Sequence, residues 1–338
     1  MRFSSLDGLR CLAIVPVVWH HATPSPPDGA LGRGPLGVDL FFAISGFLIT
    51  TLLLRERERL GRIALGRFYA RRSLRIFPMY YLVLGAFVLH AWLVREPGAV
   101  RDHFLKSLPF HATYTTNWLV DFDVPHAVVF TFAWSLATEE QFYLVWPWIL
   151  RARGLVVPAA FMLALLVVDQ ATERGLVGVE SALVLRILRS IATPICLGSL
   201  LAIGLASRFA AALRAVLGRQ ASAPIALALL AASVVVPWSL FGAHALMVAL
   251  VGACVVREDH GLRFVTDARV VQHVGVVSYG VYLLNVPIVV ATRRALGPLA
   301  EHTVLVFVVA LAATVLAATL AHRLVDRPLL AFRERLRA

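Results

Sequence analysis

The chain has 338 residues, of which 59% are hydrophobic and only 15% are charged, and its net charge is +12. Soluble domains contain about a quarter charged residues, so this composition excludes an ordinary soluble enzyme and a disordered chain. The three cysteines are too few for a disulfide scaffold, and each lies in an apolar stretch, where a buried free thiol is expected. Because the chain is so apolar, its positive charge does not predict binding to nucleic acid. In a membrane protein, the distribution of basic residues predicts which loops face the cytoplasm.

Ten segments are apolar enough to cross a membrane as helices, each of which needs about 20 mostly apolar residues. We therefore predict an all-α polytopic protein of the inner cell membrane, with both termini in the cytoplasm and residues 1–338 in one domain. In that orientation 22 basic residues face the cytoplasm and seven face outside, as the positive-inside rule requires. The predicted spans are 5–22, 36–54, 74–94, 133–150, 155–171, 183–205, 222–237, 240–256, 274–292 and 303–323.

Ionisable residues inside spans are costly in lipid and are therefore functional candidates. The first span carries Arg10 near its cytoplasmic end and His21 near its outer end. Eleven residues correspond to about 16 Å along a helix and about 20° around it, so the two share one face. Asp7 lies one turn before Arg10 and is expected to pair with it. The structural alternative is a snorkelling arginine and an interfacial histidine.

The second span opens with the string GVDLFF, in which Asp39 falls near the outer end, at the predicted depth of His21. A carboxylate there would hold an imidazole in one tautomer, as it does in hydrolytic triads. Helix capping is the structural alternative, because an aspartate near a helix start interacts favourably with the dipole.

Glu139 and Glu140 lie about two turns inside the fourth span. Adjacent positions on a helix face different partners, so we expect one carboxylate to face the interior beside a cation such as Arg186 or Arg189. A structural ion pair is the alternative to a catalytic or substrate-binding role.

Two further groups are candidates for binding the donor substrate. Arg71, Arg72 and Arg75 cluster at the cytoplasmic end of the third span, where they would bind phosphates or, alternatively, anchor the helix to anionic lipid. Ser278 and Tyr279 begin a polar stripe on the ninth span. We expect this stripe either to line a channel or to form hydrogen bonds with neighbouring helices.

The longest outer segment, about 95–132, is rich in His, Phe, Thr and Trp. It is expected either to cover the acceptor substrate, through Asn117 and Trp118, or to form an interfacial aromatic belt. The sequence contains none of the common nucleotide-binding or zinc-binding motifs, so we expect no metal and no nucleic acid.

Five strings in order carry a resemblance: Arg-x10-His from Arg10 to His21, GVDLFFxxSGF, RRxxRIxPxYY, WSLxxEEQFY and SYxxYL. Together they resemble the acyltransferase 3 family of integral membrane proteins, from LDGLR at 6–10 to RLVDRP at 323–328. The resemblance is to members without a fused esterase-like domain.

The resemblance implies transfer of an acyl group, often acetyl, from cytoplasmic acyl-CoA to a hydroxyl of a sugar, glycan, lipid or small metabolite. Arg10 and His21 match the family's essential pair, Arg72 and Arg75 match its arginine string, and Glu139 matches the glutamate after WSL. The chain departs from the family pattern at Cys11, in place of a common glycine, at Asn285, where a histidine is frequent, and at Asp326, where a glutamate is usual. These departures put a catalytic role of residues 285 and 326 in doubt.

The expected mechanism uses His21 as general base on the acceptor hydroxyl, with inner arginines holding the CoA phosphates. An acyl-histidine intermediate is the competing version. A secondary transporter with an intramembrane proton relay is the alternative function, although no internal repeat supports it.

Overall fold

The computed structural model describes residues 4–23, 36–94, 96–120, 130, 132–236 and 239–329. Within these ranges the chain forms helices and no strand, as the composition predicts. The chain falls into two compact units, which divide after Glu58, after Ala192 and after His322. Each unit is described by itself.

Unit 1 contains both the first helix and most of the last third of the chain. Its helices are α1 (Ser4–Ala22), most of α2 (Leu36–Leu60), α9 (Thr193–Leu205), α10 (Ala210–Leu217), α11 (Ser222–Val235), α12 (Leu240–Val256), α13 (Arg263–Thr266), α14 (Arg269–Leu296), η2 (Gly297–Glu301) and α15 (Thr303–Ala321). The π-helical turn η3 (His322–Asp326) follows α15. Unit 2 contains α3 (Leu65–Leu93), α4 (Ala99–Ala112), α5 (Thr116–Leu119), α6 (Ala133–Ile149), α7 (Val156–Glu173) and α8 (Ala182–Arg189).

All ten predicted spans fall on helices, and the chain is a membrane protein. Among the described residues, five helices are long and apolar enough to cross a bilayer, or seven if each bent helix pair is one span. Those are α2, α3, α7, α14 and α15, with α8–α9 and α10–α11 as the pairs. The other three predicted spans are α1 and α6, which carry ionisable side chains, and α12, which has 17 residues.

Two boundaries differ from the prediction. Helix α3 begins at Leu65 rather than near residue 74, so the arginine cluster lies within a continuous helix. The predicted span 183–205 is divided into α8 and α9 by Ser190–Ala192. Hydropathy detects a long apolar stretch but not a break in the helix within it, because such a break depends on local backbone hydrogen bonding.

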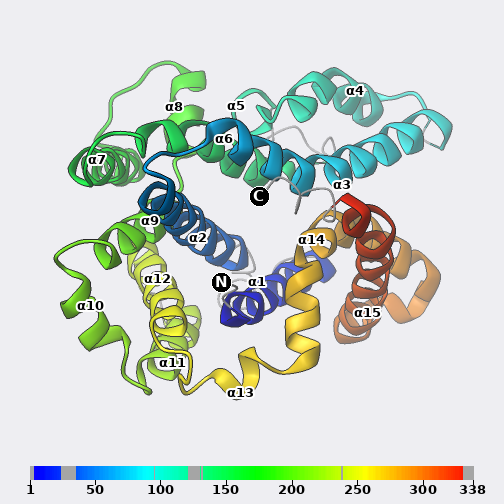
Figure 1. Cartoon of the computed structure of the whole chain (residues 1–338). Helices are drawn as coiled ribbons and strands as arrows, with labels where there is room; N and C mark the ends of the chain where they lie inside the picture. Colours follow the sequence, from blue (N-terminus) through cyan, green and yellow to red (C-terminus); the bar gives the residue numbers. More distant parts are fainter. Residues whose placement is uncertain are drawn as a thin grey trace. The chain divides into compact units, whose positions relative to one another are not determined.

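Helix α1 packs along α14 and also contacts α15 (Figure 1). The closest approach is at Gly275, where a Cβ atom would overlap the carbonyl oxygen of Asp7. At the other end, Ala22 packs with Val289, and Arg293 donates to the carbonyl oxygen of Ala22. The two helices therefore run parallel, which fixes the level of each α1 residue relative to α14.

The core of unit 1 lies among α1, α2, α9, α11 and α12 and is built from apolar side chains such as Leu9, Phe47 and Leu250. Helices α2 and α9 approach closely because glycines face the opposite backbone. A Cβ at Gly46 would overlap the carbonyl oxygen of Ile195, and one at Gly198 would overlap that of Ala43. Small residues at helix contacts are typical of membrane proteins, because packing rather than hydrophobic burial drives helix association in lipid.

In unit 2 an aromatic cluster joins α3 to α4 and α5. Tyr80 is fully buried, its ring stacks on Tyr114 at 4.4 Å, and its hydroxyl donates to the carbonyl oxygen of His111 at 2.7 Å. Phe130 packs edge-on against both Tyr80 and His111. Aromatic residues predicted for the outer segment thus pack on α3, although residues 95, 121–129 and 131 lie outside the described residues.

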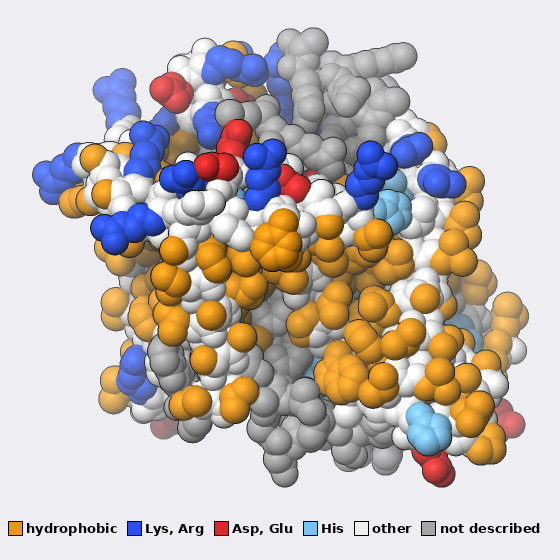
Figure 2. All heavy atoms as spheres, turned by 90° about the horizontal axis from the view of Figure 1, so that it is seen from below, with side chains coloured by type: hydrophobic (Ala, Val, Ile, Leu, Met, Phe, Trp, Pro, Cys, Tyr) orange, Lys and Arg blue, Asp and Glu red, His pale blue; other side chains and the backbone are white. Residues whose placement is uncertain are grey.

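Figure 2 shows one face of the molecule, on which Lys, Arg, Asp and Glu side chains gather along one end and hydrophobic side chains form a broad band beside them. Such a band is what a bilayer requires, since the hydrocarbon region accepts apolar side chains and excludes charges.

The close contact of α2 with α9 gives a stability test. Gly46→Ala should lower the free energy of unfolding by about 1–3 kcal/mol, because the added methyl group must displace backbone at Ile195. Gly85→Ala on α3 is the matched control: its added methyl meets open space, so helix propensity should stabilise it slightly. Thermal unfolding in detergent measures both variants, and equal unfolding temperatures would contradict the packing.

Candidate active site

Helix α1 carries polar side chains at both ends. At its first turn, Arg10 Nη1 donates to Asp7 Oδ1 at 2.7 Å, which confirms the predicted pair. Asp7 is buried and Arg10 is half-buried. Because α1 is one continuous helix, Arg10 and His21 lie about 16 Å apart along it. Because the Asp7 carboxylate on the same helix pairs with the Arg10 guanidinium, this guanidinium is held in one place.

The opposite end of α1 concentrates buried polar atoms that make no hydrogen bond to the described residues. These atoms are Trp19 Nε1, His20 Nδ1 and His21 Nδ1. The two imidazole rings lie 5.5 Å apart, and Trp19 packs edge-on against Phe307 of α15. A buried polar atom without a partner costs about 1–3 kcal/mol, so this group of side chains is suited to a polar ligand.

Asp39 contacts a histidine, but a different one from that predicted. His244 Nε2 on α12 lies 3.2 Å from Asp39 Oδ2, and the His244 side chain is only 8% exposed. The contact is close enough for charge attraction, although neither His244 ring nitrogen meets hydrogen-bond geometry with any described residue. The expectation that Asp39 faces His21 is therefore replaced by an Asp39–His244 contact between α2 and α12.

In unit 2, the glutamates of α6 meet α3. The Tyr143 hydroxyl donates to Glu139 Oε1 at 2.5 Å, and the Arg72 guanidinium lies over the Tyr143 ring at 4.6 Å. Arg72 also has Glu140 among its charged neighbours. Arg72 of α3 is thus a cation beside these glutamates, whereas the predicted Arg189 is exposed at the end of α8 and Arg186 is half-buried on it.

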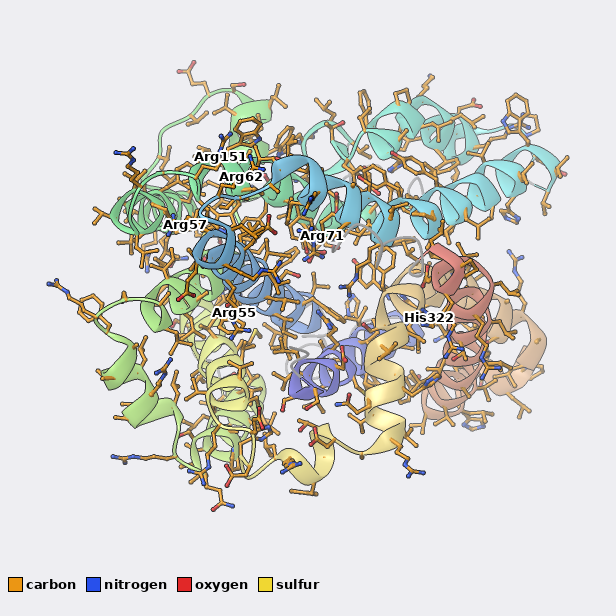
Figure 3. The ribbon with its side chains drawn as sticks, viewed as in Figure 1. Arg55, Arg57, Arg62, Arg71, Arg151 and His322 are labelled. Atoms are coloured by element: carbon orange, nitrogen blue, oxygen red, sulfur yellow. The ribbon has the colours of Figure 1, made fainter. Side chains whose placement is uncertain are left out.

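The three candidate arginines of α3 differ in exposure. Arg71 and Arg72 are half-buried and Arg75 is exposed. Figure 3 shows Arg71 on α3, with Arg62 just before α3 and Arg151 just after α6. The sequence predicts that these helix ends face the cytoplasm. Arginines are the side chains best suited to bind phosphate, so this group has the composition of an anion-binding surface.

Asn117 and Trp118, which are predicted to contact substrate, form hydrogen bonds to other side chains of unit 2. Asn117 Nδ2 donates to Gln141 Oε1 at 3.0 Å, and Gln141 Nε2 returns a bond to Asn117 Oδ1 at 2.9 Å. Trp118 Nε1 donates to Ser190 Oγ at 2.8 Å. These bonds join α5 to α6 and to the end of α8, and a contact of either residue with substrate stays a prediction.

Ser278 and Tyr279 lie on the stretch of α14 that packs along α1, between Gly275 and Val289. Ser278 is buried and Tyr279 is half-buried. Among the described residues, no group of three or more His, Cys, Asp or Glu side chains is arranged to hold a metal ion.

Sequence reasoning missed two histidines. His244 is an ionisable residue in an apolar helix, and that signal alone would have nominated it. His260, between α12 and α13, bonds Ser5 Oγ through Nε2 at 2.9 Å and so holds the start of α1. Burial lowers the pKa of His260, which keeps this ring neutral near pH 7. No local pattern links Ser5 to His260, because 255 positions separate them.

Several known O-acetyltransferases are similar to part of this chain. The peptidoglycan O-acetyltransferase OatA of Listeria monocytogenes serovar 1/2a is 33% identical over 150 residues, which are 42% of this chain and 23% of that protein. A putative O-acetyltransferase of Staphylococcus aureus (strain COL) is 38% identical over 152 residues, or 43% and 24%. The O-acetyltransferase OatA of Staphylococcus aureus (strain NCTC 8325) is 35% identical over 147 residues, or 42% and 24%.

The matched stretch therefore covers less than a quarter of the length of each of these relatives. No solved structure matches the chain. The family model described as "Acyltransferase domain" matches residues 3–323, from the start of α1 to the turn after α15. Because this match covers nearly every helix of both units, the chain belongs to the acyltransferase 3 family.

Proposed function

We propose that this protein is a membrane O-acyltransferase, which moves an acyl group, by default acetyl, from cytoplasmic acyl-CoA to a hydroxyl of a sugar, glycan, lipid-linked or small-metabolite acceptor. Membership of the acyltransferase family supports the reaction class, and the names of the relatives support O-acetylation. The helical, strongly apolar fold supports a membrane location, which we assign to the inner cell membrane.

The single observation that carries the assignment of His21 is the group of unpaired buried polar atoms at the outer end of α1. Elsewhere in the described helices, the acidic side chains Asp7, Asp39 and Glu139 each contact a partner. His21 instead has a buried nitrogen without a hydrogen bond to the described residues. Histidine, whose free side chain has a pKa near 6.5, is the residue type most often used as a general base.

In the proposed reaction His21 accepts the proton of the acceptor hydroxyl. The oxygen attacks the thioester carbonyl, the new C–O bond forms, and the C–S bond breaks. The proton on His21 then passes to the departing CoA thiolate, so no proton is gained or lost. In the competing version the imidazole attacks first and carries the acyl group, and hydroxylamine trapping of an acyl-histidine separates the two versions.

We assign the phosphates of the donor to Arg71, Arg72 and Arg75 of unit 2. The support is the position of Arg72, held over the Tyr143 ring, which is itself fixed by Glu139. A guanidinium that is pre-ordered in this way loses less side-chain entropy on binding a phosphate than a free surface arginine does. Glu139 thereby acts on the donor site through Tyr143.

His21→Ala should lower acetyl transfer by about 10²–10⁴-fold, which is the usual worth of general-base assistance, with little change in unfolding temperature. The assay uses membranes of the producing cells with radiolabelled acetyl-CoA and follows both label transfer and free CoA thiol. His20→Ala, which changes the neighbouring ring, should be milder. Full activity of His21→Ala would reject the assignment, and uptake without thiol release would favour a transporter.

Arg72→Ala should raise the KM for acetyl-CoA by roughly 10–100-fold, since it removes charge-assisted hydrogen bonds to phosphate. Tyr143→Leu should raise it by roughly 2–30-fold through loss of the cation–π contact. Tyr143→Phe keeps the ring and should have the smaller effect of the pair. A donor KM that stays unchanged in Arg72→Ala would show that the arginines anchor the helix to lipid.

The acceptor is identified by comparing extracts of cells with and without the protein. Mass spectrometry of glycans, lipids and secreted small molecules should show one species that gains the mass of an acetyl group only when active protein is present. The same extracts from cells carrying His21→Ala should lack that species.

A further inference from the structure

Asn285 on α14 lies about one helical turn before the level of the His21 Cα atom on α1. The register comes from two contacts: Gly275 lies against Asp7 near one end, and near the other Val289 shares an apolar cluster with Ala22, whose carbonyl oxygen accepts from Arg293. Between these contacts the chain advances by nearly the same number of residues on both helices, so α1 and α14 run parallel and in step. Asn285 lies one turn before Val289, on the same face of α14.

Side chains on a helix lean towards its N-terminus. The His21 ring therefore reaches back from its own Cα to the level one turn below Ala22. That is the level of Asn285, whose side chain is fully buried. The side chains of His21 and Asn285 lie close enough to interact through their polar atoms.

The hydrogen bonds of Asn285 fix the direction of its amide. Nδ2 donates to the carbonyl oxygen of Tyr282 at 2.6 Å and to that of Val281 at 3.3 Å. A flipped amide would place Oδ1 against two carbonyl oxygens, so the orientation is determined by its partners. Oδ1 then faces away from its own helix, and no described residue donates a hydrogen bond to it.

His21 supplies the complementary atom. Of its two ring nitrogens, Nδ1 is buried and lacks a hydrogen bond to any described residue. The neighbouring Trp19 also has an unpaired nitrogen, but its ring packs against Phe307 of α15 rather than along α14. A buried donor and a buried acceptor at the same level, each without another partner, satisfy one another at the lowest cost.

We propose that Asn285 is the positioning residue of His21: its Oδ1 accepts the Nδ1–H of the imidazole and leaves Nε2 unprotonated to receive the hydroxyl proton. The inference rests on the proposed function, in which His21 is the base. An asparagine orients the histidine of Cys-His-Asn proteases in the same sense. The carboxylate of Asp39, which contacts His244, is then not needed for this task.

The test measures the tautomer of His21 by NMR of ¹⁵N-histidine-labelled protein in detergent micelles. The His21 signal is assigned as the one that disappears in His21→Gln. We expect the Nδ1–H tautomer in the wild type and a shift towards Nε2–H in Asn285→Leu, which keeps the volume and removes the acceptor. Asn285→His, which offers a ring nitrogen as acceptor, should preserve the wild-type tautomer. Should Asn285→Leu fail to fold, Asn285→Ala carries the same readout.

Activity provides the second readout. In membranes with radiolabelled acetyl-CoA, Asn285→Leu should lower kcat by about 10–100-fold with an unchanged donor KM, and Asn285→His should restore most of it. Thr314→Val is the control, because its buried hydroxyl donates to the carbonyl oxygen of Ala310 on its own helix. It should change neither the tautomer nor kcat.

The same tautomer in wild type and Asn285→Leu would overturn the proposal, whatever the activity. If the tautomer shifts as expected but His21→Ala retains full transfer, Asn285 does orient the ring and it is the role of His21 as base that fails. The two claims are thus decided by separate measurements.

Discussion

The structure of unit 1 depends on how α1 satisfies its polar side chains inside an apolar environment. Lipid offers no hydrogen bonds, so each charged or polar group on a spanning helix must find its partner within the protein. Close packing on α14 makes this feasible: Gly275 lets the two backbones approach at Asp7, where Arg10 neutralises the carboxylate. A larger residue at position 275 would overlap the backbone of α1 at Asp7 and force the two helices apart there.

The intramembrane charges fall into two kinds. The carboxylates of Asp7, Asp39 and Glu139 each lie against a cation, a histidine or a hydroxyl, as expected of groups whose desolvation must be offset. The C-terminal end of α1 is different, because several buried nitrogen atoms there have no hydrogen bond to the described residues. Contacts within the protein account for the first kind, whereas at the second we propose that Asn285 pairs with His21 Nδ1 and that the acceptor hydroxyl meets Nε2.

Much of the fold was predictable from the sequence, because the apolar runs that cross a bilayer are local and long. The same holds for the Asp7–Arg10 pair, whose members are one helical turn apart. What was not predictable depends on contacts between distant segments. Asp39 meets His244 across 205 positions, and Arg72 rather than Arg189 lies beside Glu140, because helix packing and not local spacing selects these partners. The pairing of the Asn117 amide with Gln141 of another helix was not predictable for the same reason.

The proposed mechanism requires α1 to cross the membrane, with Arg10 at the cytoplasmic end and His21 at the outer end. Single cysteines at Ser4 and at Thr23, introduced after Cys11, Cys196 and Cys254 are replaced by serine, flank the helix for labelling with a membrane-impermeant maleimide. The account predicts that Thr23→Cys reacts in intact cells, whereas Ser4→Cys reacts only after the membrane is permeabilised. Labelling of both positions from the same side would contradict it.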